Sequence, residues 1–206
     1  MKLIFWYLTA AVISYLLGCI NTAAIIGRRK GFDIREKGSG NAGASNALMT
    51  MGKGAAVCTT IVDMLKAFLP VFAVRVLIPQ AASVPALAVF VGCMVMVGHI
   101  FPFWMQFRGG KGFASMLGFT LALDWKLLIA FLLITGVLLL TTKFIALATI
   151  TCGAIFPIYR VILTHSLPEF ILLLLMFILI LVKHLPNLRR MKNGSEYSLD
   201  DVKHKP

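Results

Sequence analysis

Charged side chains are scarce in this chain. Only 14% of its 206 residues are charged, whereas 59% are hydrophobic, and the mean hydropathy is +0.90. A soluble domain normally carries roughly 25% charged residues. The composition therefore excludes an ordinary soluble fold, and it predicts an integral membrane protein with one domain.

Acidic residues are much rarer than basic residues in this chain. The chain has 8 Asp and Glu against 20 Lys and Arg, which gives a formal net charge of +12. In a soluble protein such an excess would suggest a nucleic-acid partner. In a membrane protein it is the usual cytoplasmic excess of Lys and Arg, so we expect no nucleic acid among the partners.

Cysteine gives no sign of a disulfide or of a metal site. Each of the four cysteines stands alone in an apolar run, with no CxxC pair and no histidine at ligand spacing. We therefore expect Cys19, Cys58, Cys93 and Cys152 to pack among apolar side chains, without metal or other cofactor.

Long apolar runs predict membrane-spanning helices. The first run is longer than the core of a secretory signal and lacks its strongly basic lead-in, so we interpret it as an uncleaved span. The predicted spans are Leu3–Ile26, Gly54–Ile78, Val84–Phe107, two short spans within Phe113–Leu140, Phe144–Leu163 and Leu167–Val182.

Charged residues decide whether the run Phe113–Leu140 forms one span or two. Asp124-Trp125-Lys126 interrupts this run, and two short spans place Lys183–Lys192 on the same side as the basic loop Arg28–Lys37. The prediction is thus an all-α integral membrane protein with about seven transmembrane helices. Its N-terminus lies outside and its C-terminus in the cytoplasm, with a single transmembrane domain over residues 1–192 and a polar tail over 193–206.

A basic glycine turn, Arg108-Gly109-Gly110-Lys111-Gly112, follows the third predicted span. Glycines leave the backbone uncovered, so we expect its N–H groups to approach an anion and Lys111 to bind a phosphate-like group. The first glycine of a nucleotide P-loop is missing and Gly112 stands where Ser or Thr belongs, so ATP hydrolysis is not expected. The alternative is that Arg108 and Lys111 only anchor a helix end at the headgroups.

The first cytoplasmic loop contains a second glycine segment. Gly38–Gly43 fits the dinucleotide pattern GxGxxG, but it follows a charged loop and not a strand, so we attribute this match to chance. Two interpretations remain. Ser39, Asn41, Ser45 and Asn46 are hydrogen-bond partners for a phosphate or hydroxyl, or the segment is an ordinary turn that caps the next helix.

A third polar segment follows the last span. His184 and Asn187 are three residues apart and share a helix face, with Arg190 one turn further on. We expect Pro186 to end the span and start a short interfacial helix. A lone histidine near a helix end is more often structural than catalytic, and we expect His99 to form hydrogen bonds that shape the chain before the glycine turn.

Asp63 and Lys66 carry charges inside the second predicted span. Three residues apart, they can pair. Such charges mark either a functional site or a structural ion pair that also contacts loops dipping into the bundle. Pro70 is expected to kink the same span and to make room for the pair.

Taken together, the segments GSGNAGASN, GHIFPFWMQFRGGKGFAS and KHLPNLRRMKNGSE resemble the bacterial acyl-phosphate:glycerol-3-phosphate acyltransferases of the PlsY type. The resemblance runs from the first span to Glu196. It implies transfer of a fatty acyl group from acyl phosphate to the 1-hydroxyl of glycerol 3-phosphate, the first acylation step of bacterial phospholipid synthesis. It further implies a monomer in the bacterial plasma membrane, with its active site on the cytoplasmic side and no metal, nucleotide or other cofactor.

The resemblance also implies residue roles. Ser39, Lys111, His184 and Asn187 fall on the family's catalytic positions. Lys111 would hold phosphate and offset charge during attack, while His184 and Asn187 would orient glycerol phosphate. The expected substrate-binding residues are Gly38, Gly40, Asn41, Asn46, Arg108, Gly109, Gly110, Gly112 and Arg190. The expected supporting residues are Asp63, Lys66, His99, Thr149 and Glu196.

The chain departs from the family pattern at a few positions. Met49 replaces an arginine, Ser45 a threonine, Ala67 a glycine and Ala146 a serine, although Thr149 keeps a hydroxyl nearby. The missing arginine predicts weaker phosphate binding, unless Lys53 or Arg108 compensates. Two alternatives are a small membrane transporter of a phosphorylated or anionic solute, which the lack of an inverted repeat disfavours, and a non-catalytic partner of lipid enzymes.

Overall fold

The computed structural model describes residues 2–84, 86–198 and 200–201, and among these residues it contains helices and no strand. Residue 199 and residues 202–206 of the predicted tail lie outside the described part. The helices are α1 (Lys2–Gly18), α2 (Thr22–Arg29), η1 (Ile34–Glu36), α3 (Ala44–Met51), α4 (Lys53–Phe72), η2 (Ala73–Leu77, a π-helix), α5 (Pro79–Ala82), α6 (Leu87–Ile100), η3 (Phe103–Met105), α7 (Phe113–Leu123), α8 (Trp125–Thr142), α9 (Ile145–Thr164) and α10 (Leu167–Lys192).

Six helical segments of the described chain are long and apolar enough to cross a membrane. They are Leu3–Arg29, Lys53–Leu77, Leu87–Met105, Trp125–Thr142, Ile145–Thr164 and Leu167–Lys192, and a shorter apolar helix is Phe113–Leu123. The predicted all-α membrane fold is confirmed, as is the division of Phe113–Leu140 at Asp124. The predicted orientation across the membrane stays a prediction.

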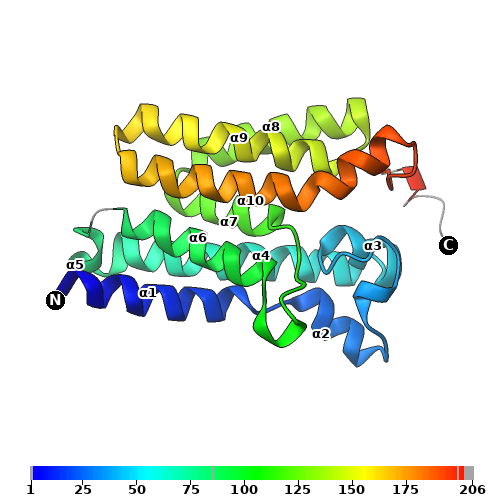
Figure 1. The fold of residues 1–206 in the computed structure, drawn as a ribbon, viewed down its shortest axis with the longest axis horizontal. Helices are drawn as coiled ribbons and strands as arrows, with labels where there is room; N and C mark the ends of the chain where they lie inside the picture. Colours follow the sequence, from blue (N-terminus) through cyan, green and yellow to red (C-terminus); the bar gives the residue numbers. More distant parts are fainter. Residues whose placement is uncertain (1, 85, 199, 202–206) are drawn as a thin grey trace. The chain divides into compact units, whose positions relative to one another are not determined.

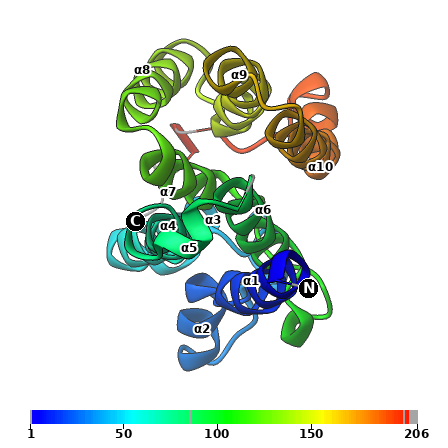
Figure 2. The ribbon, with the colours of Figure 1, turned by 90° about the vertical axis from the view of Figure 1, so that its left-hand side faces the viewer.

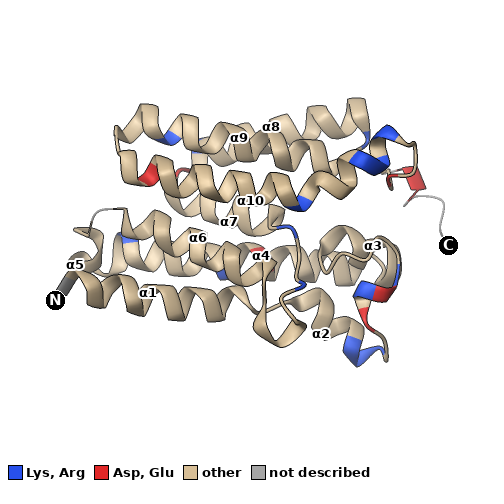
Figure 3. Ribbon diagram, in the orientation of Figure 1, with Lys and Arg blue, Asp and Glu red and all other residues tan. Residues whose placement is uncertain are grey.

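The chain divides into two compact units, Met1–Trp125 and Lys126–Pro206. The single domain over 1–192 and the tail over 193–206 remain predictions. Lys and Arg residues cluster along the chain at the end of α2 and in the loop before α3 in the first unit, and at the end of α10 in the second (Figure 3).

The first unit is built from close helix pairs. α1 lies along α6, α4 lies along α7, and α3 packs on the start of α4 (Figures 1 and 2). Gly18 and Gly98 face each other where α1 meets α6, since a Cβ on Gly18 would strike the Val95 carbonyl and one on Gly98 the Tyr15 carbonyl. Small residues allow this approach between apolar helices, where packing is the main attraction in lipid.

Arg75 satisfies the end of the short helix α7. From the π-helix η2, its guanidinium donates hydrogen bonds to the carbonyl oxygens of Ala122, at 2.7 Å, and of Leu123. The last carbonyls of a helix have no partner within it, and an unsatisfied carbonyl is costly in hydrocarbon. This contact explains how α7 ends after 11 residues.

The second unit contains α8, α9 and α10. α9 packs along α10, and the ion pair between Arg160 and Glu169, at 2.6 Å, joins them across the turn at Ser166. The rings of Phe131 and Phe156 pack edge to face between α8 and α9, with centroids 5.9 Å apart.

Three boundaries differ from the sequence prediction. The first span is interrupted after Gly18, and α2 begins at Thr22 with Asn21 as its N-cap. The third span is α-helical over Leu87–Ile100, and the 3-10 helix η3 follows it at Phe103–Met105. The expected end of the last span at Pro186 is wrong: α10 continues to Lys192, because the proline withholds one backbone hydrogen bond while the residues around it keep their helical conformation.

Candidate active site

Asn46 holds the first glycine loop in shape. Its Oδ1 accepts a hydrogen bond from the backbone N–H of Ser39 at 2.8 Å, and its Nδ2 donates to the carbonyl oxygens of Ile34 at 2.9 Å and Lys37 at 3.0 Å. The side chain is completely buried. Because these contacts all go to the loop's own backbone, they support a scaffolding role, and direct contact between Asn46 and substrate stays a prediction.

Gly38 and Gly40 allow the backbone conformation of this loop. Both have left-handed backbone conformations, with φ of 59° and 72°, and a Cβ on Gly38 would collide with Asn46 Oδ1. Residues with a side chain rarely adopt such angles. Ser39 is therefore held between two glycines and is half-buried, as is Asn41.

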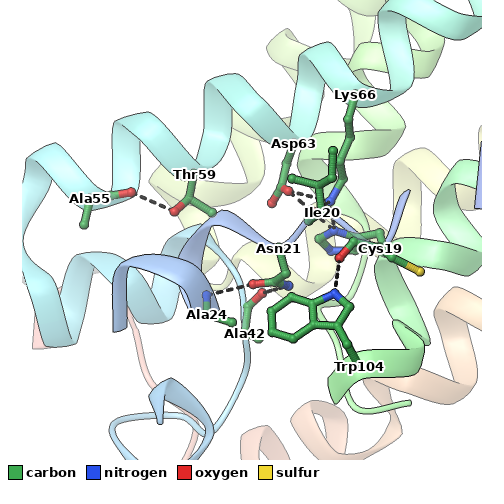
Figure 4. Close-up of polar contacts among 11 residues, drawn as sticks. Cys19, Ile20, Asn21, Ala24, Ala42, Ala55, Thr59, Asp63, Lys66 and Trp104 are labelled. Carbon is green, nitrogen blue, oxygen red and sulfur yellow. Dashed lines mark hydrogen bonds and ion pairs between the residues drawn. The ribbon is translucent and has the colours of Figure 1, made fainter. Parts of the chain in front are cut away.

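Asn21 ties the loop to the interruption in the first span. Its Nδ2 donates to the carbonyl oxygen of Ala42 at 2.9 Å, and its Oδ1 caps α2 by accepting from the N–H of Ala24 at 2.9 Å (Figure 4). The side chain is buried. One amide thus fixes both the start of α2 and the position of the glycine loop.

The glycine turn folds back onto the end of α6. The N–H of Gly110 donates to the carbonyl of His99 at 3.1 Å, and that of Gly109 to the carbonyl of Ile100 at 3.0 Å. The expectation that these N–H groups face an anion is therefore wrong for these two residues, because the turn uses them internally. Gly112, with φ of 91°, caps α7, while Lys111 is half-buried and Arg108 exposed.

Gly110 brings the two glycine segments together. A Cβ on this residue would collide with the His99 ring at Nε2, and it would lie 3.1 Å from the Ala42 carbonyl oxygen of the first loop. The first two predicted motifs therefore meet in the first unit, where Gly110 lies next to Ala42.

Asp63, Lys66 and His99 form a buried cluster next to this contact. We call it the Lys66 cluster. Lys66 Nζ lies 2.7 Å from Asp63 Oδ1 and 2.8 Å from His99 Nδ1, and it donates to the carbonyl oxygen of Ile20 at 2.6 Å (Figure 4). The predicted pairing of Asp63 with Lys66 is confirmed, as are the predicted hydrogen bonding of His99 and the contact of the pair with a loop.

Side chains from the first loop and from η3 clamp the chain around the glycine turn. The indole N–H of Trp104 donates to the Cys19 carbonyl at 2.8 Å, and the guanidinium of Arg28 lies 4.7 Å from the Trp104 ring centroid. Arg35 donates to the Met105 carbonyl at 2.7 Å. These contacts hold the segment before the turn against the interruption at Cys19, the end of α2 and the following loop.

Asp33 orients Arg35 for this contact. The two side chains form an ion pair at 2.6 Å, and two guanidinium nitrogens of Arg35 donate to the carboxylate. These hydrogen bonds lower the pKa of Asp33 below its ordinary value and raise that of Arg35. The pair lies in the loop beyond the first membrane segment.

In the second unit, the predicted residues of the last motif lie on α10. His184 and Asn187 are both buried. His184 Nδ1 lies 2.8 Å from the Ile180 carbonyl oxygen. A carbonyl can only accept, so we assign the proton of the neutral ring to Nδ1, which makes Nε2 the nitrogen with the lone pair.

Glu196 connects the other two predicted residues of this motif. Its carboxylate accepts hydrogen bonds from Asn187 Nδ2 at 2.5 Å and from Arg190 Nε at 2.7 Å. The chain returns to α10 here through a turn at Gly194, where φ is 67°. Thr149, on α9, is buried and donates its hydroxyl to the Ile145 carbonyl of its own helix at 3.0 Å.

The structure thus assembles the predicted residues in two groups. The first group combines both glycine segments with the Lys66 cluster, and the second combines His184, Asn187, Arg190 and Glu196. A common site for the two groups stays a prediction. Sequence reasoning missed Asn21, Trp104 and Arg35 as supporting residues. The polar pair Asn21-Thr22 inside an apolar run would have indicated the interruption, but it was not used.

The apolar helices define an integral membrane protein, and its lysine-bearing glycine turn lies beside a polar glycine loop. The comparisons with known proteins give the family. The model of the family described as "Glycerol-3-phosphate acyltransferase" matches residues 8–194 of this chain. The chain therefore belongs to the glycerol-3-phosphate acyltransferase family, of the PlsY type.

Relatives match along almost the whole chain. The glycerol-3-phosphate acyltransferase of Pelagibacter ubique is 35% identical over 193 residues, covering 92% of this chain and 96% of its own. That of Synechococcus elongatus is 37% identical over 195 residues, covering 90% and 91%.

Solved structures of PlsY (YgiH), an integral membrane glycerol 3-phosphate acyltransferase, are also similar. The glycerol 3-phosphate form matches with a TM-score of 0.87 at 27% identity, covering 97% of this chain and 99% of that chain. The lysophosphatidic acid form matches with a TM-score of 0.82 at 26% identity, with the same coverage of both chains.

Proposed function

We propose that this enzyme transfers a fatty acyl group from acyl phosphate to the 1-hydroxyl of glycerol 3-phosphate, giving lysophosphatidic acid and phosphate. The attacking hydroxyl oxygen forms a bond to the acyl carbonyl carbon while the bond from that carbon to the phosphate oxygen breaks. We place the reaction in the bacterial plasma membrane, on its cytoplasmic side, with the chain acting as a monomer.

The observation that carries the proposal is the likeness to PlsY in two forms. One form is named for glycerol 3-phosphate and the other for lysophosphatidic acid, which correspond to a substrate and a product of this reaction. Both proposed substrates carry phosphate, for which the chain offers basic loops, and the acyl tail is compatible with a protein built from apolar helices.

Lys111 is the proposed phosphate-binding cation. It stands two residues before α7 begins at Phe113, and Gly112 caps that helix without a side-chain hydrogen bond. The first N–H groups of a helix lack intrahelical partners and carry partial positive charge. A phosphate or a developing oxyanion beside Lys111 would be stabilised by both. Ser39 and Arg108 are the proposed polar neighbours from the two glycine segments.

His184 and Asn187 are proposed to orient glycerol phosphate. With the ring proton on Nδ1, the lone pair of His184 Nε2 suits acceptance of a hydrogen bond from the attacking hydroxyl. The proton ends on the departing phosphate, directly or by way of this nitrogen. Acyl phosphate is already an activated donor, so no covalent intermediate on Ser39 is required.

The decisive experiment measures phosphate release and lysophosphatidic acid formation by the purified protein with acyl phosphate and glycerol 3-phosphate. We expect turnover by the wild type and its abolition in Lys111→Ala. Lys126→Ala, which removes an exposed lysine at the start of α8, is the matched control and should keep full activity. Absence of turnover where a known family member is active would refute the proposal.

A further inference from the structure

The Lys66 ammonium has three hydrogens and three close acceptors. These are Asp63 Oδ1 at 2.7 Å, the Ile20 carbonyl at 2.6 Å and His99 Nδ1 at 2.8 Å. An ammonium group can only donate. Lys66 therefore combines hydrogen bonds to Ile20 and His99 with an ion pair to Asp63, in a place where Asp63, Lys66 and His99 are all buried.

These contacts determine where the proton of His99 lies. His99 Nδ1 accepts from Lys66, and its distance to Asp63 Oδ1 is 3.6 Å, which is too long for a hydrogen bond. The neutral ring therefore carries its proton on Nε2. That is the opposite tautomer from the one assigned to His184.

The other edge of the His99 ring sets the position of the glycine turn. A Cβ on Gly110 would collide with Nε2, would lie 2.7 Å from Cε1 and would lie 3.1 Å from the Ala42 carbonyl oxygen. The N–H of Gly110 is bonded to the backbone carbonyl of the same histidine. Gly110 is thus enclosed by His99 and the first loop, and Lys111 is the next residue.

The same ammonium is also connected to the first loop. Lys66 binds the carbonyl of Ile20, and the adjacent residue, Asn21, binds the carbonyl of Ala42. Figure 4 shows these groups gathered around the interruption between α1 and α2. Both glycine segments are therefore connected to Lys66, one through His99 and the other through Ile20 and Asn21.

We propose that Lys66 and His99 are positioning residues for acyl transfer: Lys66 fixes the tautomer and the orientation of the His99 ring, and the Nε2 edge of the ring fixes Gly110 and so Lys111. This inference rests on the proposed function of Lys111. It assigns to the buried ion pair a part in the reaction beyond stabilising the fold.

The first test observes the tautomer directly by ¹⁵N NMR of histidine-labelled protein in nanodiscs at neutral pH. The chain has 4 histidines, and the variant His99→Gln identifies the relevant signal by its loss. We expect a protonated Nε2 and an unprotonated Nδ1 in the wild type, and a changed signal in Lys66→Met. A ring protonated on Nδ1 in the wild type would overturn the proposal. This readout does not require turnover, so it is independent of the proposed function.

The second test separates positioning from stability. Arg160→Met is the matched control, because it removes a buried cation from another ion pair, in the second unit. Both Lys66→Met and Arg160→Met should melt at lower temperature. Below their melting points, Lys66→Met should lose about 100-fold in kcat, since misplacement by about 1 Å can cost that much, while Arg160→Met stays near wild type. Equal kcat for folded Lys66→Met and wild type would refute a positioning role.

Discussion

The Glu196 carboxylate accepts a hydrogen bond of 2.5 Å from the side-chain amide of Asn187. It also binds Arg190 at 2.7 Å, so a residue beyond the end of α10 orients two side chains on that helix. The orientation of the Asn187 amide, which we propose to contact glycerol phosphate, thus depends on a carboxylate outside the helix.

Replacing Glu196 by glutamine should lower kcat/KM for glycerol 3-phosphate. The neutral amide loses charge-assisted hydrogen bonds to Asn187 and Arg190, each worth roughly 1.5–3 kcal/mol. We expect a loss of about tenfold or more, measured as initial rates at varied glycerol 3-phosphate. Glu36→Gln, at an exposed acid in η1, is the control. Unchanged kinetics in Glu196→Gln would show that this carboxylate has no influence on the site.

Adding one methyl group at Gly110 should inactivate the enzyme. The new Cβ would strike the His99 ring and would press on the Ala42 carbonyl at 3.1 Å, so the turn that carries Lys111 must shift. If this shift removes about 1.4 kcal/mol of transition-state stabilisation, the rate falls tenfold. Gly136→Ala is the comparison, since a Cβ there meets nothing within 4 Å. Full activity of Gly110→Ala would contradict the tight packing of the turn.

Restoring arginine at Met49 should improve phosphate binding. Met49 is half-buried on α3, three residues beyond Asn46, so it lies one turn from the side chain that shapes the first loop. A new charge-assisted hydrogen bond to phosphate would contribute roughly 1.5–3 kcal/mol. We expect Met49→Arg to lower the KM of a phosphate-bearing substrate about tenfold. Leu48→Arg puts the same charge on another side of α3 and should leave this KM unchanged. No gain at Met49 would mean that Lys53 or Arg108 already supplies the contact, or that none is needed.

The Asp33–Arg35 pair should stabilise the first loop except in strong acid. The pKa of Asp33 in the folded protein lies below its ordinary value of 3.8. Its contribution is therefore fully present above that value, and it is lost as the pH falls below 3.8 through the lower folded pKa. The melting temperature difference between wild type and Asp33→Asn, measured in detergent, should be constant from about pH 7 to pH 5 and should shrink below about pH 4. A difference that disappears already near pH 6 would assign the effect to another group.

Sequence reasoning could predict what depends on neighbouring residues. Apolar runs gave the spans, and the charged interruption at Asp124 correctly divided α7 from α8. The three-residue spacing of Asp63 and Lys66 likewise indicated their ion pair. Each of these features follows from residues close together in the chain.

Contacts between distant residues could not be predicted in the same way. Lys66 reaches Ile20 across 46 residues, and Trp104 reaches Cys19 across 85. The internal hydrogen bonds of Gly109 and Gly110 depend on how the chain turns at the end of α6. Pro186 was misjudged because local preference favours a helix end there, whereas α10 tolerates the loss of one hydrogen bond.

The interruption of the first span has a consequence for biogenesis. The carbonyls of Cys19 and Ile20 find their partners on Trp104 and Lys66, which the ribosome delivers much later. Until then, these backbone groups must be solvated in another way, because hydrocarbon offers them no hydrogen bond. The N-terminal span can thus complete its native contacts only after both α4 and the segment that carries Trp104 have been synthesised. A nascent chain that stops short of Trp104 would lack a native partner for the Cys19 carbonyl.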